Sequence, residues 1–193
     1  MNLQNIPVEK LVHHPKNPRK DIGDITELSD SIKAKGILQN LTVVPAGDEY
    51  YVVIGNRRME AAKAAGLKTL PCVIAEMDEK EQMETMLLEN IQRVDLTVKE
   101  QADGFQLMMD LGLTVEELSE KTGFAKSTIY HRLNVAKLDG DILEQKQVSM
   151  KQLIELEKIK SITKRNEIIA NYGNSPSFSY QVGYAAEEEK AEE

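Results

Sequence analysis

Two adjacent arginines follow a glycine in the stretch Gly55-Asn56-Arg57-Arg58, which has the make-up of an anion site. The apolar run over residues 50–54 is typical of a strand, and the Ala-rich run that ends at Gly66 is typical of a helix. A strand that enters a helix through glycine gathers backbone N–H groups at the positive end of the helix dipole. Guanidinium groups offer paired donors to phosphate oxygens. The stretch therefore predicts a phosphate site.

A second group of polar side chains lies in a predicted helix-turn-helix over residues 114–133. Thr114 and Glu117 have the spacing of a capping box, and Gly123 permits a tight turn. In the second helix, Ile129 and Leu133 face inward. The other side chains of that helix are predicted to be exposed and to reach phosphates or base edges: Lys126, Ser127, Thr128, Tyr130, His131 and Arg132. Such a helix enters the major groove of double-stranded DNA. A plain helix pair with a solvated polar face is the alternative.

The elements that must position these groups divide the chain into two halves and a tail. Residues 1–94 alternate strand and helix patterns, so we expect an α+β domain. From residue 95 onward only helical periodicity remains, so we expect an all-α domain over 95–175. Residues 176–193 end in a run of glutamates with few apolar residues, which predicts a flexible acidic tail. We expect strands at 41–44 and 50–54, paired as a hairpin, and a third strand at 70–74. In the first half we expect one helix that is capped by Thr26, a second that starts at Arg58 and a third over about 79–93.

Composition limits the setting in which the protein works. The net charge of −8 means that DNA binding would come from a local patch rather than from a basic surface overall. No apolar run approaches the ~20 residues that a membrane span needs, and no signal pattern opens the chain. A single cysteine, Cys72, fits a reducing cytoplasm, and its apolar surroundings predict a buried small hydrophobe. His13 and His14 have no evident third ligand, so we do not expect a metal site there.

Three blocks, in this order, resemble the ParB/RepB-type partition proteins. Residues 14–19 (His-Pro-Lys-Asn-Pro-Arg) are similar to the family's N-P-x-Q-P-R loop, residues 55–61 are similar to G-E-R-R-x-R-A, and residues 89–93 look like E-N-[IL]-Q-R without a change. The helix-turn-helix follows at the expected distance. Over about residues 5–180, the resemblance implies a ParB-like N-terminal domain that binds CTP and a helix-turn-helix domain that binds a palindromic centromere-like site.

The resemblance also implies roles for single residues. Glu89 and Asn90 would hold Mg²⁺, for which carboxylate and amide oxygens are suitable ligands, and any weak CTPase activity would depend on Glu89. Arg19 would close over the nucleotide from the first loop. The full nucleotide-binding set that we expect is Arg19, Gly55, Asn56, Arg57, Arg58, Glu89, Asn90 and Arg93.

Two positions depart from the family pattern. Asn56 stands where the family usually has Glu, and Glu60 stands where it usually has Arg. An anion at position 60 disfavours phosphate if it points inward, although the helix period places it about 200° from Arg58. A structural alternative for the arginine pair is that it forms salt bridges with Glu84 or Glu89.

The leading hypothesis is a sequence-specific DNA-binding protein for plasmid, phage or chromosome partition, acting as a CTP-dependent clamp. We expect a homodimer in the cytoplasm, associated with the nucleoid or a plasmid, with a ParA-type ATPase as a possible partner and no membrane contact. One alternative is a ParB-like transcriptional repressor without a nucleotide switch. Another is a nuclease or phosphotransferase on the same fold, for which the sequence offers no obvious nucleophile.

Overall fold

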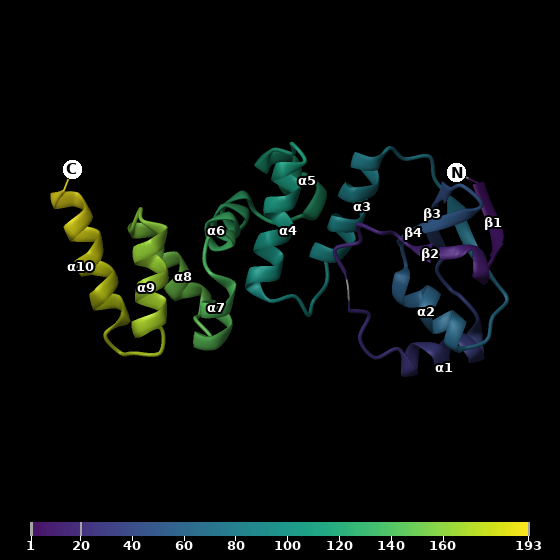
Figure 1. The fold of residues 1–193 in the computed structure, drawn as a ribbon, viewed down its shortest axis with the longest axis horizontal. Helices are drawn as coiled ribbons and strands as arrows, with labels where there is room; N and C mark the ends of the chain where they lie inside the picture. Colours follow the sequence, from purple (N-terminus) through teal and green to yellow (C-terminus); the bar gives the residue numbers. More distant parts are fainter. Residues whose placement is uncertain (1, 20, 193) are drawn as a thin grey trace. The chain divides into compact units, whose positions relative to one another are not determined.

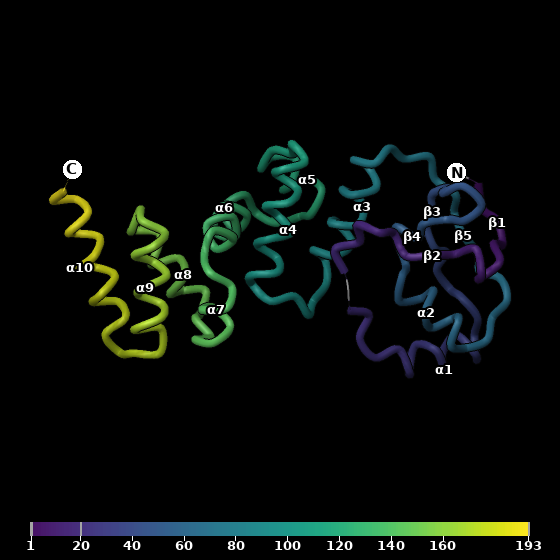
Figure 2. The backbone as a smooth tube through the Cα atoms, viewed as in Figure 1, coloured from purple at the N-terminus to yellow at the C-terminus, as the bar shows by residue number. Residues whose placement is uncertain are grey.

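The chain forms two compact units, Met1–Gln92 and Arg93–Glu193, in a computed structural model that describes residues 2–19 and 21–192. The first unit mixes strands and helices and the second is helical (Figures 1 and 2). The predicted fold class, an α+β domain followed by an all-α domain, is confirmed. No helix in the described ranges combines the length and the apolar character needed to cross a membrane.

The first unit contains one mixed sheet in the strand order β1-β5-β3-β4-β2. β1 and β5 are antiparallel, as are β3 and β4, whereas β5 and β3, and likewise β4 and β2, are parallel. The expected strands 41–44 and 50–54 form the hairpin β3–β4, whereas neither β1 nor β2 was among the strands expected from the sequence. The elements are β1 (Asn2–Pro7), η1 (Val8–Lys10), β2 (Leu11–His13), α1 (Thr26–Lys35), β3 (Leu41–Ala46), β4 (Glu49–Ile54), α2 (Asn56–Ala64), β5 (Thr69–Ile74) and α3 (Glu79–Ile91).

Alternation along the strands buries both faces of this sheet. Val43 and Val52 pack with Met59 of α2 and with α1, whereas the next residues, Val44 and Val53, pack on the opposite face with α3. Because side chains alternate with a period of two, one strand serves both cores. The sheet thus fixes α2 and α3, the two helices that carry most of the predicted nucleotide residues, on its two faces.

Several helices of the second unit begin at side-chain caps, whereas α6 and α10 begin without one. The predicted capping box of Thr114 and Glu117 is confirmed, and a box of the same kind begins α4 and α8. In the first unit, by contrast, Thr26 is the first residue of α1 rather than its cap, which is Ile25. The helices are α4 (Val98–Asp110), α5 (Val115–Thr122), α6 (Lys126–Ala136), α7 (Gly140–Lys146), α8 (Met150–Glu155), η2 (Leu156–Lys158), α9 (Ile162–Tyr172) and α10 (Phe178–Ala191).

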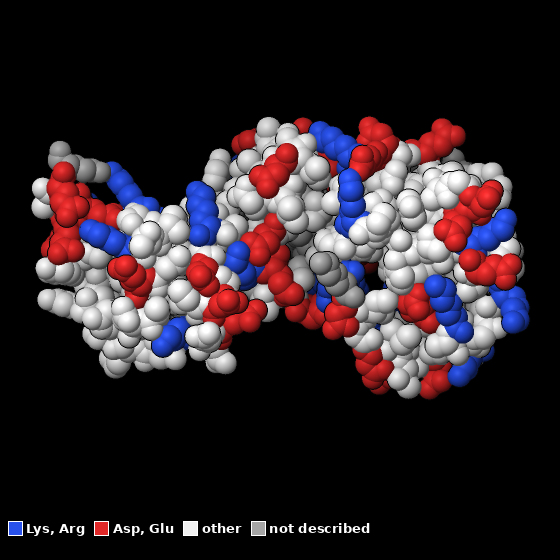
Figure 3. Space-filling view, viewed as in Figure 1, with Lys and Arg blue, Asp and Glu red and all other residues white. Residues whose placement is uncertain are grey.

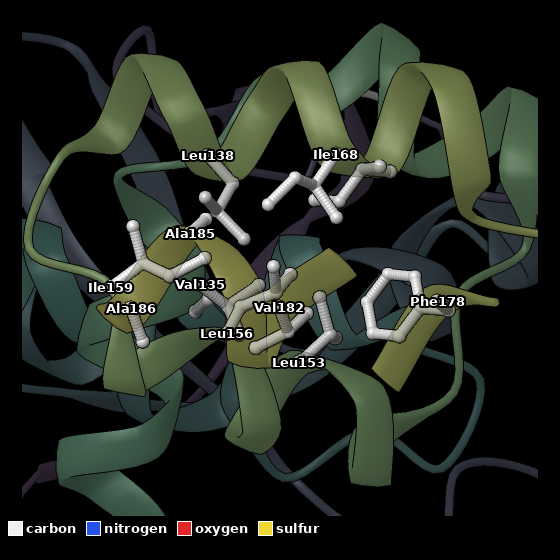
Figure 4. Packing of buried hydrophobic residues seen from close by; sticks show 12 residues of the cluster. Val135, Leu138, Leu153, Leu156, Ile159, Ile168, Phe178, Val182, Ala185 and Ala186 are labelled. Atoms are coloured by element: carbon white, nitrogen blue, oxygen red, sulfur yellow. The ribbon is translucent and has the colours of Figure 1, made fainter. Parts of the chain in front are cut away.

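The prediction of a flexible tail over 176–193 was wrong for α10. Phe178, Val182, Ala185 and Ala186 are buried and lie among the aliphatic side chains of α8, η2 and α9 (Figure 4). The glutamate run concealed this apolar face because the buried residues are small or widely spaced. Glu193, which the predicted tail included, lies outside the described residues.

The glutamates of α10 also make specific contacts. Glu189 accepts hydrogen bonds from the backbone N–H groups of Lys160 and Ser161, at 2.6 and 3.0 Å, where α9 begins. Glu188 and Glu192 each lie 4.0 Å from the ammonium of Lys164. A carboxylate at a helix N-terminus satisfies open donors and the helix dipole together. The acidic run therefore attaches α10 to α9.

We predict that Glu189→Gln lowers the midpoint of thermal unfolding at neutral pH. The N–H groups of Lys160 and Ser161 lower the pKa of the Glu189 carboxyl, Lys160 foremost. A lowered pKa stabilises the fold above the ordinary value of 4.5, and this stabilisation is lost as the pH falls below it. The difference between wild type and variant should therefore shrink in acid. Glu187→Gln, at an exposed position on the same helix, is the matched control; equal effects of the two substitutions would contradict the capping role.

Candidate functional site

Gly55 forms the sharp entry from β4 into α2. Its φ is 100°, in the left-handed region, and a Cβ atom there would lie 3.1 Å from Leu41 Cγ and 3.2 Å from the guanidinium of Arg58. Only glycine fits this position without strain. No side-chain cap is recorded for α2, unlike α3, α4 and α5. The first N–H groups of α2 are thus left to other acceptors.

Backbone carbonyls orient both arginines of this turn. Arg57 donates to the carbonyl of Asp24 at 2.7 Å, and Arg58 donates to the carbonyls of Gln39 and Asn40 at 2.6 and 2.8 Å. Within the described ranges, neither arginine forms a salt bridge, so the alternative of pairing with Glu84 or Glu89 is not observed. A carbonyl fixes a guanidinium without cancelling its charge. The pair therefore retains its capacity to attract an anion.

Arg58 is half-buried, and two effects act on its charge. Burial lowers the pKa of its guanidinium, and the carboxylate of Glu89 on α3 acts in the opposite direction. Glu89 is thus close enough to interact electrostatically with the arginine turn. Asn90, its neighbour, is also half-buried. The structure brings Gly55, Arg58 and Glu89 into one region of the first unit.

Arg19 approaches the same region through the loop before α1. It donates to the carbonyls of Asp21 and Ile22, at 2.9 and 3.4 Å, while Arg57 holds the carbonyl of Asp24 in the same loop. A cavity of about 560 Å³ opens here, lined by Asp24, Glu27, Leu28 and Arg57. A neighbouring cavity of about 250 Å³ lies between α1 and Arg58. Arg93, by contrast, begins the second unit and pairs with Asp95 at 2.6 Å.

The two departures from the family pattern contact a common partner. His13, at the end of β2, lies 2.7 Å from the amide oxygen of Asn56 and 3.0 Å from the carboxylate of Glu60. Lys63 reaches the same carboxylate at 2.9 Å. Glu60 is therefore engaged with His13 and Lys63, rather than with Arg58. Sequence reasoning missed His13 because its partners lie 43 and 47 residues away.

The described residues contain no group of three His, Cys, Asp or Glu side chains that could hold a metal by themselves. Cys72 is buried in β5, as predicted, and burial raises the pKa of its thiol to about 11. A thiol with that pKa is protonated at neutral pH and is a poor nucleophile.

The helix-turn-helix consists of α5 and α6, joined at Gly123, whose φ is 77°. Lys126, Ser127 and Tyr130 are exposed on α6, and 54% of Tyr130 is accessible. Lys126 forms an exposed pair with Glu116 at 2.7 Å. Lys137, which was not among the predicted residues, is also exposed. Its helical spacing from Lys126 can be read from the sequence. Charges of both signs are interspersed on the face shown in Figure 3.

The expected exposure of three α6 residues was wrong. Thr128 is only partly exposed. His131 bonds to Glu157 at 2.9 Å, and Arg132 donates to Gln101 at 2.7 Å and contacts Met150. Burial lowers the pKa of Arg132. Helices α4 and α8 and the η2 turn cover this side of α6, which could not be seen from the periodicity of α6 alone.

Comparison with known proteins identifies the first unit. Residues 1–91 match the family model described as the ParB N-terminal domain. The first unit belongs to the ParB N-terminal domain family. The family's glycine-arginine block is the strained entry to α2, and its E-N-[IL]-Q-R block covers the end of α3.

Curated relatives match beyond this domain. The chain is 40% identical over 141 residues to the chromosome-partitioning protein Spo0J of Thermus thermophilus, covering 72% of this chain and 52% of that protein. It is 37% identical over 140 residues to the chromosome-partitioning protein ParB of Myxococcus xanthus, covering 71% and 47%. The chain thus spans about half the length of these relatives.

A solved structure extends the likeness to both units. It is the C-terminally truncated chromosome-partitioning protein ParB from Caulobacter crescentus, complexed to the centromeric parS site. The TM-score is 0.72 with 26% sequence identity, covering 95% of this chain and 99% of that chain. The helical unit therefore shares its fold with a partition protein crystallised on DNA.

We predict that Gly55→Ala destabilises the first unit more than Gly66→Ala. Both positions have positive φ, at 100° and 80°, so alanine is strained at each by about 1–2 kcal/mol. At Gly55 the added methyl also meets Leu41 and Arg58, whereas nothing lies within 4 Å at Gly66. In urea unfolding of the full chain, we expect Gly55→Ala to lower the free energy of unfolding by about 1 kcal/mol more than Gly66→Ala does. Equal losses would mean that the turn is not crowded.

Proposed function

We propose that this chain is a CTP-binding, sequence-specific DNA-binding protein that acts in partition of a chromosome or other replicon. The observation that supports this most is the arginine turn: two guanidiniums held by carbonyls, at a glycine-led helix start, in a ParB N-terminal domain. The relatives named as chromosome-partitioning proteins support the biological role.

The arginine turn suits a triphosphate. The N–H groups at the start of α2 would donate to phosphate oxygens, and Arg57 and Arg58 would add charged donors on either side of the turn. Glu89 and Asn90 fit Mg²⁺ as a carboxylate and an amide oxygen, with the remaining ligands coming from phosphate and water, as is usual for this ion. Bound Mg²⁺ would neutralise phosphate charge beyond what the arginines balance. Arg19 would hold the loop before α1 over the nucleotide.

The helical unit suits double-stranded DNA. We assign base contacts to Ser127 and Tyr130, which are exposed on α6, and phosphate contacts to Lys126. The parS complex of the Caulobacter protein supports DNA as the ligand of this unit. A palindromic site has two half-sites and calls for two copies, so we propose a homodimer that closes as a clamp. Association with the nucleoid and with a ParA-type ATPase follows from this role.

We predict that Arg58→Ala weakens binding of labelled CTP in the presence of Mg²⁺ by about tenfold or more, since a charged hydrogen bond is lost. Lys33→Ala, at an exposed position of α1 that lies 3.9 Å from Asp30, is the control. The comparison is made by equilibrium titration of the full chain, with ATP and GTP as competitors. The nucleotide role is refuted if the wild-type protein binds no CTP, or if Arg58→Ala binds it equally well.

We predict that Tyr130→Ala and Lys126→Ala affect DNA binding in different ways. A duplex is first selected from a random library, and affinity is then measured against salt concentration. Loss of Tyr130 should cost about 1–3 kcal/mol on the selected duplex and little on unselected DNA, whereas loss of Lys126 should weaken both and reduce the salt slope by about 1. Unchanged affinities for both variants would exclude this face of α6 as the DNA-reading surface.

A further inference from the structure

His13 connects the edge of the sheet to the helix that carries the arginine turn. Its Nδ1 lies 2.7 Å from Asn56 Oδ1, and its Nε2 lies 3.0 Å from Glu60 Oε1. Asn56 and Glu60 are one helical turn apart on α2 and lie on either side of Arg57 and Arg58 in sequence. One imidazole therefore bridges the first two turns of α2.

The other hydrogen bonds of Asn56 and Glu60 show which of their atoms accept from His13. The Asn56 amide nitrogen donates to the carbonyl of Val52 at 3.2 Å, so its oxygen is the atom that faces His13. The Glu60 carboxylate has no proton to give and also accepts from Lys63. Both ring nitrogens thus face acceptors. A neutral imidazole carries one N–H and can serve only one of them, whereas the imidazolium serves both.

In the described part of the chain, few other charged groups face the ring. From α2, Asn56 and Glu60 face His13, and Lys63 acts on it through Glu60. From β4, which pairs with β2, the residue opposite is Val52. The neighbouring His14 turns instead to Gln82 and Tyr51. The His13 side chain is 43% exposed, so it can exchange protons with solvent while the fold stays intact.

We propose that His13 is a positioning residue for the arginine turn, and that its imidazolium form fixes the start of α2 through Asn56 and Glu60. This inference rests on the proposed nucleotide site and adds to it a dependence on pH. The protonated ring makes both bonds. As the pH rises and the ring loses a proton, one bond is lost, the first turn of α2 loosens and nucleotide affinity falls.

Glu60→Gln tests this while leaving a partner at both ring nitrogens of His13. The bond from Lys63, which uses the same Oε1 atom, is lost when the amide nitrogen faces the ring, so Lys63→Ala, which removes that bond alone, is the control. A carboxamide can donate to an unprotonated Nε2 while Nδ1–H still donates to Asn56, so a neutral ring keeps both bonds in the variant. The variant replaces one carboxylate oxygen by an NH2 group at a partly exposed position, where 27% of the side chain is accessible. The variant therefore separates a requirement for the charged ring of His13 from a requirement for its two contacts alone.

The first readout needs no nucleotide. Nitrogen-15 spectra of the imidazoles are recorded on the full-length wild type and on Glu60→Gln across pH 6 to 9, with His13→Gln used to assign the resonances. We expect two protonated nitrogens on His13 at pH 7 in the wild type and one in the variant. A neutral His13 in the wild type at pH 7, or the same titration in both proteins, overturns the proposal.

The second readout is CTP affinity at pH 6.5 and 8.5. Ionisation of the nucleotide itself is common to both proteins, so the ratio between them isolates His13. We expect the wild type to lose about fivefold more affinity than Glu60→Gln over this interval, the effect of one hydrogen bond. Equal pH profiles refute positioning by the charged ring. If neither protein binds CTP, the proposed function fails, while the spectra still decide whether His13 is held as imidazolium.

Discussion

The anion site depends on guanidinium groups that are fixed by partners carrying no net charge. Carbonyls of Asp24, Gln39 and Asn40 hold Arg57 and Arg58 in place. Had carboxylates done so, the pair would be neutralised before any ligand arrived, and a phosphate would have to displace them. Carbonyl partners impose geometry at little electrostatic cost. The segment from the loop before α1 to the start of β3 supplies these carbonyls.

This arrangement accounts for the close fit at Gly55. The guanidinium of Arg58 lies so close to the backbone of its own turn that a side chain at position 55 would push against it. Glycine therefore serves both the backbone angle and the space above it. On the other face of the sheet, α3 brings Glu89 within electrostatic range of Arg58. Both helices are fixed by strands that bury alternate residues on opposite faces.

Local patterns in the sequence predicted what local physics determines. The hairpin, the arginine helix, the Thr114 cap and the burial of Cys72 all follow from neighbouring residues. The predictions that were wrong, and the contacts that were missed, depend on residues far away in the sequence. Arg132 is covered by Gln101 and Met150, and His13 contacts Asn56. The prediction of a flexible tail at α10 was wrong for a different reason, because Glu189 caps α9 instead of facing solvent. Composition cannot distinguish those two uses of a glutamate.

The buried thiol has a practical consequence for studying the protein in motion. Cys72 is the one cysteine in the chain, and it is inaccessible within β5 and strongly protonated near neutrality. Maleimide reagents, which need a thiolate at the surface, will not react with it. Cysteines introduced on α6 or α10 can then carry spin labels, fluorophores or bismaleimide crosslinks in an otherwise native background. Distances between two copies become measurable without first engineering the sheet.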